Sequence, residues 1–371
     1  MNIALLGLEG DFVNSAGAGI QRYMFNLYEN LKKLTTNCNY VNISGGHPPY
    51  IRTPPDIEKI EITKLPIIGT GFSFSLKTFF LNLNKFNIIH HLMPLTTYAR
   101  PKILRDNILL TTVHDFYYYP DLHPELVDIK NIPVKERLWV NLITIPAAKN
   151  ILLSDYLIAD SLQTKEEAIK LGFEKNKIFA VNLGIDNRYF SDFPQQKNRQ
   201  KTFILGYLGE LNINKNLPFA INAVNIIKDN DIKFEIWGNK TWSYNQLKNL
   251  IKNKNISLQG FAPENKIIDI YDSFDVFLFP SLCEGFGLPI LEAQARGLPV
   301  IIYKNGQISK EVRKYCFEAE SPEHMAQIIE DIKKNGYNEK LKKKATEYAR
   351  SFTWERCAKE TLKVYIDKVL K

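Results

Sequence analysis

Two glutamates flanking a glycine-rich turn are the residues best suited to chemistry in this sequence. Glu284 and Glu292 lie in segment 280–293, which reads PSLCEGFGLPILEA. A carboxylate can accept hydrogen bonds from two sugar hydroxyls at once, and such charge-assisted bonds are short and strong. The pair could therefore bind hydroxyl groups on the two sides of a phosphate group.

The turn between the glutamates predicts an anion site at the start of a helix. The apolar run 276–279 before it predicts a strand. Pro289 is favoured in a first helical turn, and Gly297 marks the helix end. A helix N-terminus presents unpaired N–H groups, which suit a phosphate. We expect the phosphate to contact the turn, which comprises Gly285, Phe286, Gly287 and Leu288.

Strand and helix patterns alternate along both halves of the chain, which predicts two α/β domains with parallel sheets. In the first half, strands are expected at 3–6, 88–90, 108–113, 156–159 and 178–181, with helices at 20–31 and 164–171. In the second half, strands are expected at 203–208, 234–237, 256–258, 276–279 and 300–302.

A polar segment without periodicity, 187–201, is interpreted as the linker between the domains. We therefore expect an N-terminal domain at 1–190 and a C-terminal domain at 202–352. Ligands of open α/β sheets bind at the carboxyl ends of the strands, so a cleft between the two domains is the expected site.

The composition is that of a soluble globular protein, and its positive net charge is compatible with three classes of partner. Hydrophobic residues make up 45% and charged residues 24% of the 371 residues, and the net charge is +8. Nucleic acid, anionic lipid and phosphorylated small molecules are all partners for such a charge. The basic residues are scattered apart from a helical cluster at 340–344, interpreted as a solvated face, so we expect no nucleic-acid partner.

The cysteines and the N-terminus favour a reducing compartment. Cys38, Cys283, Cys316 and Cys357 form no CxxC pair, so neither a zinc site nor a disulfide framework is expected. The first residues contain no basic leader, and no run of 18 apolar residues occurs. We expect a cytoplasmic protein that needs neither metal nor cofactor.

The spacing of Glu284 and Glu292, with seven residues between them, resembles the E-x7-E motif of family 4 glycosyltransferases. The resemblance implies the GT-B fold, in which two Rossmann-like domains face each other across a cleft. It also implies a retaining enzyme with a nucleotide diphosphate sugar as donor. In that family the first glutamate holds hydroxyls of the donor sugar and the second holds the ribose. Residues 353–371 would form the helix that crosses back to the N-terminal domain.

Segment 207–217 is similar to the first motif of the second domain in this family, with one departure. The resemblance implies that Lys215 neutralises the donor diphosphate. The usual arginine of the motif is replaced by Glu210. Two unit charges about 4 Å apart interact by about 4 kcal/mol at an effective dielectric near 20, so an acid beside a diphosphate is unfavourable. We therefore expect Glu210 to turn away, or another cation to compensate.

Three further segments resemble family motifs. Gly19 belongs to a glycine-rich loop that implies contact with the donor phosphates, and His114 ends a strand in the His-Asp pattern found under the donor sugar. Phe261 lies in a turn similar to the one that reads the nucleobase.

Residues 229–231 imitate a metal-binding D-x-D motif but are interpreted as a turn. Residues 77–86 have an amphipathic pattern that fits a core-facing helix or a membrane surface.

Together these features predict a hexosyltransferase of cell-surface polysaccharide assembly. Glu284, His114 and Lys215 are the expected catalytic residues, and the acceptor would be a glycan or a lipid-linked oligosaccharide, with peripheral association at the inner face of the membrane. The segment 114–125 resembles mannosyltransferases and related hexosyltransferases, so GDP-mannose is the first expected donor and a UDP-hexose the second. The alternatives are a nucleotide-sugar epimerase and an inactive relative that binds sugar or serves as a scaffold; Glu210 supports the last.

Overall fold

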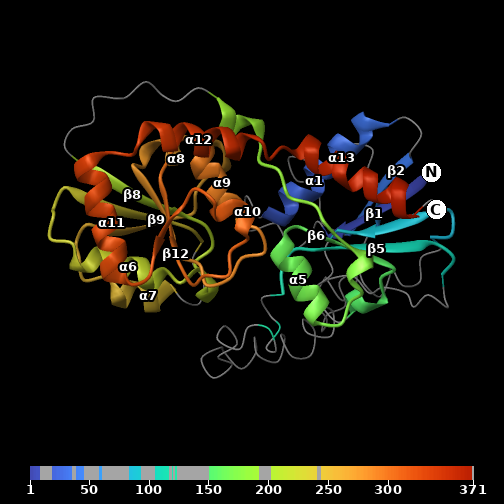
Figure 1. Cartoon of the computed structure of the whole chain (residues 1–371), viewed down its shortest axis with the longest axis horizontal. Helices are drawn as coiled ribbons and strands as arrows, with labels where there is room; N and C mark the ends of the chain where they lie inside the picture. The colour runs from blue at the N-terminus through green and yellow to red at the C-terminus, as the bar shows by residue number, and fades with distance from the viewer. Residues whose placement is uncertain are drawn as a thin grey trace. The chain divides into compact units, whose positions relative to one another are not determined.

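The computed structural model describes residues 1–8, 19–35, 39–45, 58–60, 83–92, 105–116, 119, 122, 150–191, 202–239 and 244–369. The chain forms two compact units (Figure 1). The N-terminal unit comprises Met1–Gly184 together with Trp354–Lys371, and the C-terminal unit comprises Ile185–Thr353.

The N-terminal unit contains a parallel sheet, with the order β3-β2-β1-β4-β5-β6-β7 in the described residues. Its strands are β1 (Asn2–Leu8), β2 (Asn39–Gly45), β3 (Glu58–Ile60), β4 (Ile88–His91), β5 (Ile108–Val113), β6 (Tyr156–Ala159) and β7 (Ile178–Ala180). Its helices are α1 (Gly19–Leu34), α5 (Leu162–Lys170), α13 (Trp354–Val364), the 3-10 turns η5 (Asn150–Leu153) and η6 (Lys175–Lys177), and the π-helix η10 (Tyr365–Val369).

Helix α1 packs against α13, so the end of the chain belongs to the N-terminal unit (Figure 1). The buried side chains of α1 recur at helical spacing: Tyr23, Met24, Leu27, Tyr28 and Leu31. On α13 the buried face includes Trp354, Cys357, Ala358, Thr361 and Val364. Both helices are amphipathic, and each covers an apolar stripe of the other.

The C-terminal unit contains a second parallel sheet, with the order β10-β9-β8-β11-β12-β13. Its strands are β8 (Phe203–Leu208), β9 (Ile232–Trp237), β10 (Ile256–Gly260), β11 (Val276–Phe279), β12 (Val300–Tyr303) and β13 (Phe317–Ala319). Its helices are α6 (Leu217–Ile226), α7 (Tyr244–Leu250), α8 (Ile267–Ser273), α9 (Leu288–Ala295), α10 (Lys310–Arg313), α11 (Pro322–Asn335) and α12 (Glu339–Arg350), with the 3-10 turns η7 (Asn187–Phe190), η8 (Ile213–Lys215) and η9 (Glu264–Lys266).

In each sheet the strand order reverses beside the first strand, at β1/β4 and at β8/β11. Loops that leave two such neighbouring strands run in opposite directions across the sheet, which opens a binding site at the carboxyl ends. Loops that follow β8 and β11 carry Lys215 and Glu284, and a loop that follows β5 carries His114. The fold therefore places Lys215 and Glu284 at the β8/β11 reversal point of the C-terminal sheet. His114 lies one strand away from the β1/β4 reversal point of the N-terminal sheet.

The central strands β11 and β12 of the C-terminal sheet are buried on both faces, as expected for a parallel sheet covered by helices. All four residues of β11 are buried. Gly206 of β8 is required by packing, because a Cβ atom there would lie 2.1 Å from the ring of Phe274. This ring stacks on Phe277 of β11 at 6.4 Å between centroids. The missing side chain thus lets an aromatic layer lie directly on the sheet.

The strands predicted from hydrophobic runs are confirmed in both units. The predicted linker 187–201 begins with η7, whose Tyr189 is fully buried in the C-terminal unit; residues 192–201 lie outside the described residues. Asp229–Asp231 is a turn, with the Asp231 amide donating to the Asp229 side chain at 2.9 Å. Of the amphipathic segment 77–86, the described Leu83 and Phe86 are buried, and residues 77–82 lie outside the described residues.

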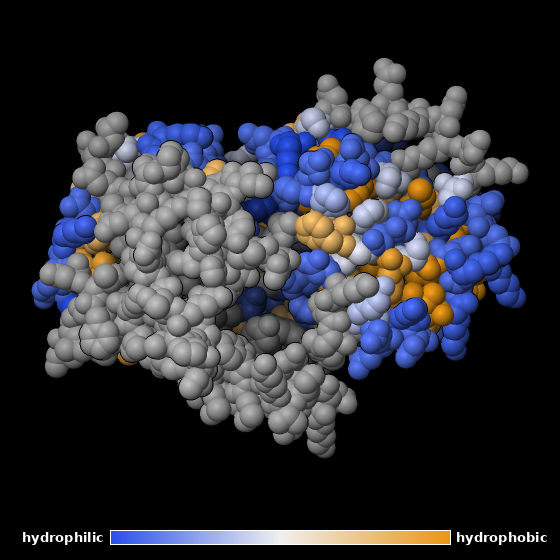
Figure 2. Space-filling model, turned by 180° about the vertical axis from the view of Figure 1, so that it is seen from behind, coloured by the Kyte–Doolittle hydropathy of each residue, from blue (hydrophilic) through white to orange (hydrophobic). Residues whose placement is uncertain are grey.

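Hydrophilic residues cover much of the described surface in Figure 2, with hydrophobic areas between them. The exposed large apolar side chains among the described residues are distributed over several elements: Leu152, Leu153, Leu162, Ile226, Phe261 and Ile366. Within the described part of the chain, every helix is too short or too polar to cross a membrane.

Candidate functional site

Three loops at the carboxyl edge of the C-terminal sheet are joined by main-chain hydrogen bonds. They follow β8, β11 and β12. The amide of Leu282 donates to the Asn214 carbonyl at 2.7 Å, and the amide of Gln307 donates to the Leu282 carbonyl at 2.7 Å. The amide of Glu284 in turn donates to the Gln307 carbonyl at 2.9 Å. These bonds fix the loop of Lys215 against the loop of Glu284.

Lys215 and Glu284 form an ion pair across these loops. Lys215 Nζ donates to Glu284 Oε1 at 2.6 Å, and the side chains are only 17% and 11% exposed. Lys215 ends η8, and the next residue, Asn216, turns the chain into α6 with a left-handed φ of 48°. The structure thus brings together two residues for which the sequence predicted separate ligand groups.

The glycine-rich turn leads into α9 as the sequence predicted. Gly287 has a φ of 102°, which favours glycine, and it is the N-cap of a helix that begins at Leu288 with a proline in its first turn. Gly297, with a φ of 72°, follows the other end. There the Leu298 amide donates to the Ala293 carbonyl at 3.0 Å, which closes a Schellman motif.

Glu292 lies inside the unit, on the second turn of α9. It is 2% exposed, and its Oε2 accepts a hydrogen bond from the hydroxyl of Tyr271 on α8 at 2.8 Å. Phe286, in the turn before α9, is 3% exposed and its ring lies 5.9 Å from that of Phe352. The two glutamates therefore differ: Glu284 pairs with a cation, and Glu292 is held by a tyrosine.

Glycines occupy the carboxyl ends of three neighbouring strands. The Gly209 amide donates to the Trp237 carbonyl at 3.0 Å, and the Gly238 amide donates to the Gly260 carbonyl at 2.8 Å. A Cβ atom on Gly238 would lie 2.1 Å from the Gly209 carbonyl oxygen, so the chains approach closely only without a side chain. Phe261, which follows Gly260, is 46% exposed.

Glu210 is exposed, and its side chain has a partner within its own loop. Its Oε2 accepts from the Asn212 side-chain nitrogen Nδ2 at 2.6 Å, and its main-chain carbonyl accepts from the Tyr207 hydroxyl at 2.7 Å. Burial raises the pKa of Tyr207 well above its ordinary value, and the carboxylates of Glu284 and Glu210 raise it further. Tyr207 therefore remains a donor and anchors the loop.

In the N-terminal unit, His114 lies at the end of β5 and is 8% exposed. Its Nε2 lies 3.0 Å from the Leu92 carbonyl, which can only accept, so this nitrogen carries a proton. Its Nδ1 lies 3.6 Å from Asp160 Oδ2. Burial raises the pKa of Asp160 to about 6, although bonds with His114 oppose the rise. Both ring nitrogens thus face protein groups, and a sugar hydroxyl would have to compete with one of them.

A buried polar chain beside His114 links the sheet to the C-terminal segment. His90 Nδ1 lies 2.6 Å from the Tyr365 hydroxyl, and His90 Nε2 lies 2.7 Å from Thr112 Oγ1. Thr112 Oγ1 lies 2.8 Å from the Tyr23 hydroxyl of α1. Burial lowers the pKa of His90 to about 3, helped by His91 and His114, so the ring is neutral. Gly19, the other residue predicted here, is the first residue of α1.

Sequence reasoning missed Tyr271 and the main-chain bonds that join the loops. Tyr271 lies near Ile267 and Ile270 at helical spacing, which signals core packing rather than a partner for Glu292. The residue type was the available signal, because a tyrosine at a core position of a helix usually needs a hydrogen-bond partner for its hydroxyl. Among the described residues, no cluster of three or more histidine, cysteine or carboxylate side chains could hold a metal ion.

Comparisons with known proteins show that the C-terminal unit is similar to a family of glycosyltransferases. Residues 190–352 match the model of the family described as Glycosyl transferases group 1. The chain is 24% identical over 278 residues to O-antigen chain mannosyltransferase B of Escherichia coli, and the match covers 69% of each protein.

Two solved structures share the fold over almost the whole chain. Sucrose-phosphate synthase from Thermosynechococcus elongatus has a TM-score of 0.75 at 18% identity, covering 99% of this chain and 98% of that one. Anabaena Alr3699/HepE, in complex with UDP and glucose, has a TM-score of 0.71 at 15% identity, covering 99% of both. With the two parallel α/β sheets, these likenesses confirm the predicted GT-B fold.

Proposed function

We propose that this chain, a glycosyltransferase with the GT-B fold and a group 1 domain at residues 190–352, transfers a hexose from a nucleoside diphosphate sugar with retention of configuration. The acceptor is a glycan or a lipid-linked oligosaccharide in cell-surface polysaccharide assembly. The observation that carries the proposal is the Lys215–Glu284 pair at the β8/β11 reversal, on loops joined by main-chain bonds next to the start of α9.

In this proposal Lys215 and the N-terminus of α9 bind the diphosphate. An ammonium carries three donors, so a bond to Glu284 and a bond to a phosphate oxygen are compatible. The backbone of Gly285 to Leu288 approaches the phosphate without a side chain at Gly287, where a Cβ atom would lie 3.3 Å from Val312. Positive groups aimed at the leaving diphosphate stabilise the charge that develops when the glycosidic bond breaks.

The two glutamates then bind the two sugars of the donor. Glu284, held in place by Lys215, accepts hydrogen bonds from hydroxyls of the transferred hexose. Glu292 accepts hydrogen bonds from hydroxyls of the ribose. Phe261, at the end of β10, lies beside the nucleobase. In the N-terminal unit, Gly19 and His114 stay proposed ligand-binding residues, with His114 exchanging one protein partner for a sugar hydroxyl.

The reaction needs no metal and no protein nucleophile in this proposal. The acceptor hydroxyl attacks from the face that the diphosphate leaves, and a diphosphate oxygen takes the proton of that hydroxyl. The protein binds and orients the donor, stabilises the leaving group through Lys215, and excludes water. Association with the inner face of the membrane would bring the enzyme to a lipid-linked acceptor.

Mannose is the first candidate for the transferred sugar, supported by the name of the Escherichia coli relative. Glucose from UDP-glucose is the second, supported by the UDP and glucose in the complex of the Anabaena protein. A thermal-shift panel of GDP-mannose, UDP-glucose, UDP-galactose and the free diphosphates identifies the donor, since a ligand that binds the native state raises the Tm.

Release of nucleoside diphosphate from the donor, measured with excess EDTA, tests the chemistry. We expect slow release without acceptor and faster release with it, and Glu284→Gln should abolish both. Activity that is lost in EDTA and restored by manganese would contradict the metal-free proposal. The inactive-scaffold alternative, favoured by Glu210 in place of the usual arginine, predicts binding without release.

A further inference from the structure

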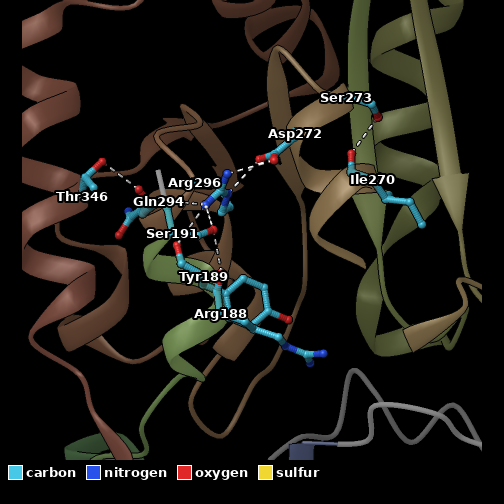
Figure 3. Close-up of polar contacts among 9 residues, drawn as sticks. All are labelled: Arg188, Tyr189, Ser191, Ile270, Asp272, Ser273, Gln294, Arg296 and Thr346. Atoms are coloured by element: carbon cyan, nitrogen blue, oxygen red, sulfur yellow. Dashed lines mark hydrogen bonds and ion pairs between the residues drawn. The ribbon is translucent and has the colours of Figure 1, made fainter. Parts of the chain in front are cut away.

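Two consecutive residues of α8 hold two residues that are one turn apart at the end of α9. The Tyr271 hydroxyl donates to Glu292 Oε2 at 2.8 Å. Arg296 binds the next α8 residue, Asp272, in a bidentate manner, with Nε at 2.7 Å from Oδ1 and Nη2 at 2.9 Å from Oδ2 (Figure 3). The Arg296 amide also donates to the Glu292 carbonyl at 3.1 Å. The turn of α9 that carries Glu292 is therefore fixed at two points.

The hydroxyl of Tyr271 has little freedom to move. Tyr271 is fully buried, and its ring packs against three others, with centroids at 5.9 Å for Tyr189, 5.4 Å for Phe277 and 6.4 Å for Phe274. A hydrogen bond to a charged acceptor is stronger than one between neutral groups. The packed ring therefore holds the carboxylate of Glu292, itself 2% exposed, in one orientation.

The same guanidinium also holds the segment that enters the C-terminal unit. Arg296 Nη1 donates to the Ser191 carbonyl at 2.8 Å, to Ser191 Oγ at 3.0 Å and to the Tyr189 carbonyl at 3.4 Å. Figure 3 shows Arg296 between Asp272 on one side and Tyr189 and Ser191 on the other. From a further element, α12, Thr346 donates to the Gln294 carbonyl at 3.0 Å. The end of α9 is thus fixed from three elements.

We infer that Tyr271 is a positioning residue for nucleotide recognition: it aims the carboxylate of Glu292 at the ribose hydroxyls, on a helix turn fixed by the Arg296–Asp272 pair. The inference rests on the proposed function, which assigns the ribose to Glu292. A carboxylate that is already oriented loses less freedom when it binds a ligand, so the hydroxyl of Tyr271 contributes to affinity without touching the nucleotide.

Tyr271→Phe tests this role because it removes one oxygen and keeps the packed ring. The probes are UDP and GDP with their 2′-deoxy and 3′-deoxy analogues, measured by isothermal titration. The parent protein should bind the deoxy analogue that lacks the ribose hydroxyl held by Glu292 more weakly than it binds the ribonucleotide. Tyr271→Phe should weaken binding of the ribonucleotide by about three- to tenfold and leave the deoxy analogue nearly unchanged, so the ratio of the two Kd values should approach one.

Tyr348→Phe is the matched control, since the Tyr348 hydroxyl donates to a main-chain carbonyl, that of Glu311, at 2.8 Å in the same unit. It should keep the parent ratio of Kd values. In Glu292→Gln the ratio of the two Kd values should fall to about one. Adding Tyr271→Phe to Glu292→Gln should cause no further loss of affinity for the ribonucleotide. If Tyr271→Phe lacks a cooperative unfolding transition, Asp272→Asn replaces it, because it loosens Arg296 and should bring the same ratio closer to one.

The outcomes separate the inference from the proposed function. If the ratio of Kd values falls to about one in Glu292→Gln but keeps its parent value in Tyr271→Phe, only the role of Tyr271 is overturned. A ratio that survives Glu292→Gln overturns the ribose assignment and the role of Tyr271 with it. Additive losses in the double variant also overturn the inference, because they indicate that Tyr271 does not act through Glu292.

Discussion

Lys215 Nζ lies 2.6 Å from Glu284 Oε1, so the cation proposed for the diphosphate and the carboxylate proposed for the sugar orient one another. The pair joins the loops after β8 and β11, and both side chains are largely buried. Removal of one member of such a pair leaves the other as an uncompensated charge. The effect of a single substitution therefore includes the behaviour of the stranded partner.

Lys215→Met should remove most of the transfer activity. It takes away a positive charge beside the developing diphosphate anion, and loss of such a group commonly lowers kcat by about 10² to 10³. It should also weaken nucleoside diphosphate binding, measured by titration at fixed salt because screening changes such contacts. The double variant with Glu284→Gln separates the loss of the positive charge from the effect of a stranded Glu284 carboxylate, since no such carboxylate remains. Parent-like diphosphate binding in both variants would mean that the phosphate site is elsewhere.

Glu284→Gln and Glu292→Gln should have opposite effects on the free diphosphate. Glu284→Gln should nearly abolish transfer, yet bind UDP or GDP at least as tightly as the parent, because Lys215 no longer shares its charge with Glu284. Glu292→Gln should weaken the diphosphate, because the buried carboxylate is proposed to hold the ribose. Equal losses of diphosphate affinity in the two variants contradict this division of roles.

Local sequence signals were sufficient for the scaffold of the site. The apolar run 276–279, the glycines and Pro289 predicted β11, the turn and the start of α9, because strand burial, left-handed φ angles and first-turn prolines are local properties of the chain. The alternation of strands and helices predicted both parallel sheets, because a helix between two strands brings the chain back so that the next strand runs in the same direction.

The contacts between distant segments could not be predicted in the same way. Lys215 and Glu284 are 69 positions apart, and Tyr271 and Glu292 are 21 apart, so their meeting depends on strand order and helix packing. His114 shows the same limit, since the partners of its ring come from Leu92 and Asp160, at the ends of neighbouring strands. Residue types indicated what these side chains could bind, and only the fold determines what they do bind.

Glu210 should be a minor residue for diphosphate binding. It is exposed and accepts a hydrogen bond from Asn212, while its main-chain carbonyl is held by the hydroxyl of Tyr207. We predict that Glu210→Ala changes the Kd of the diphosphate by less than about threefold, as is usual for exposed charges. Glu210→Arg should tighten binding at low salt and lose that gain at high salt. A large loss of activity in Glu210→Ala would instead give the carboxylate a direct role.

The N-terminal unit should lose stability as the pH falls from about 7 to 5. His90 and His91 are buried with pKa values lowered to about 3, so below the ordinary value of 6.5 the unfolded chain binds protons that the folded chain does not. Each histidine should then cost about 2 kcal/mol at pH 5. Asp160 acts in the opposite direction, because its raised pKa of about 6 makes the folded chain bind a proton first, which offsets about 1 kcal/mol.

Urea unfolding at pH 7, 6 and 5, followed by a probe in this unit, measures the dependence. His90→Gln should make the decline shallower, although it lowers the stability at every pH by disturbing the bonds to Tyr365 and Thr112. Asp160→Asn should make the decline steeper, because the offset from the carboxyl group is lost. The slopes of the two variants must therefore lie on opposite sides of the parent slope. If His90→Gln retains the parent slope, the buried neutral histidine is not the source of the acid sensitivity.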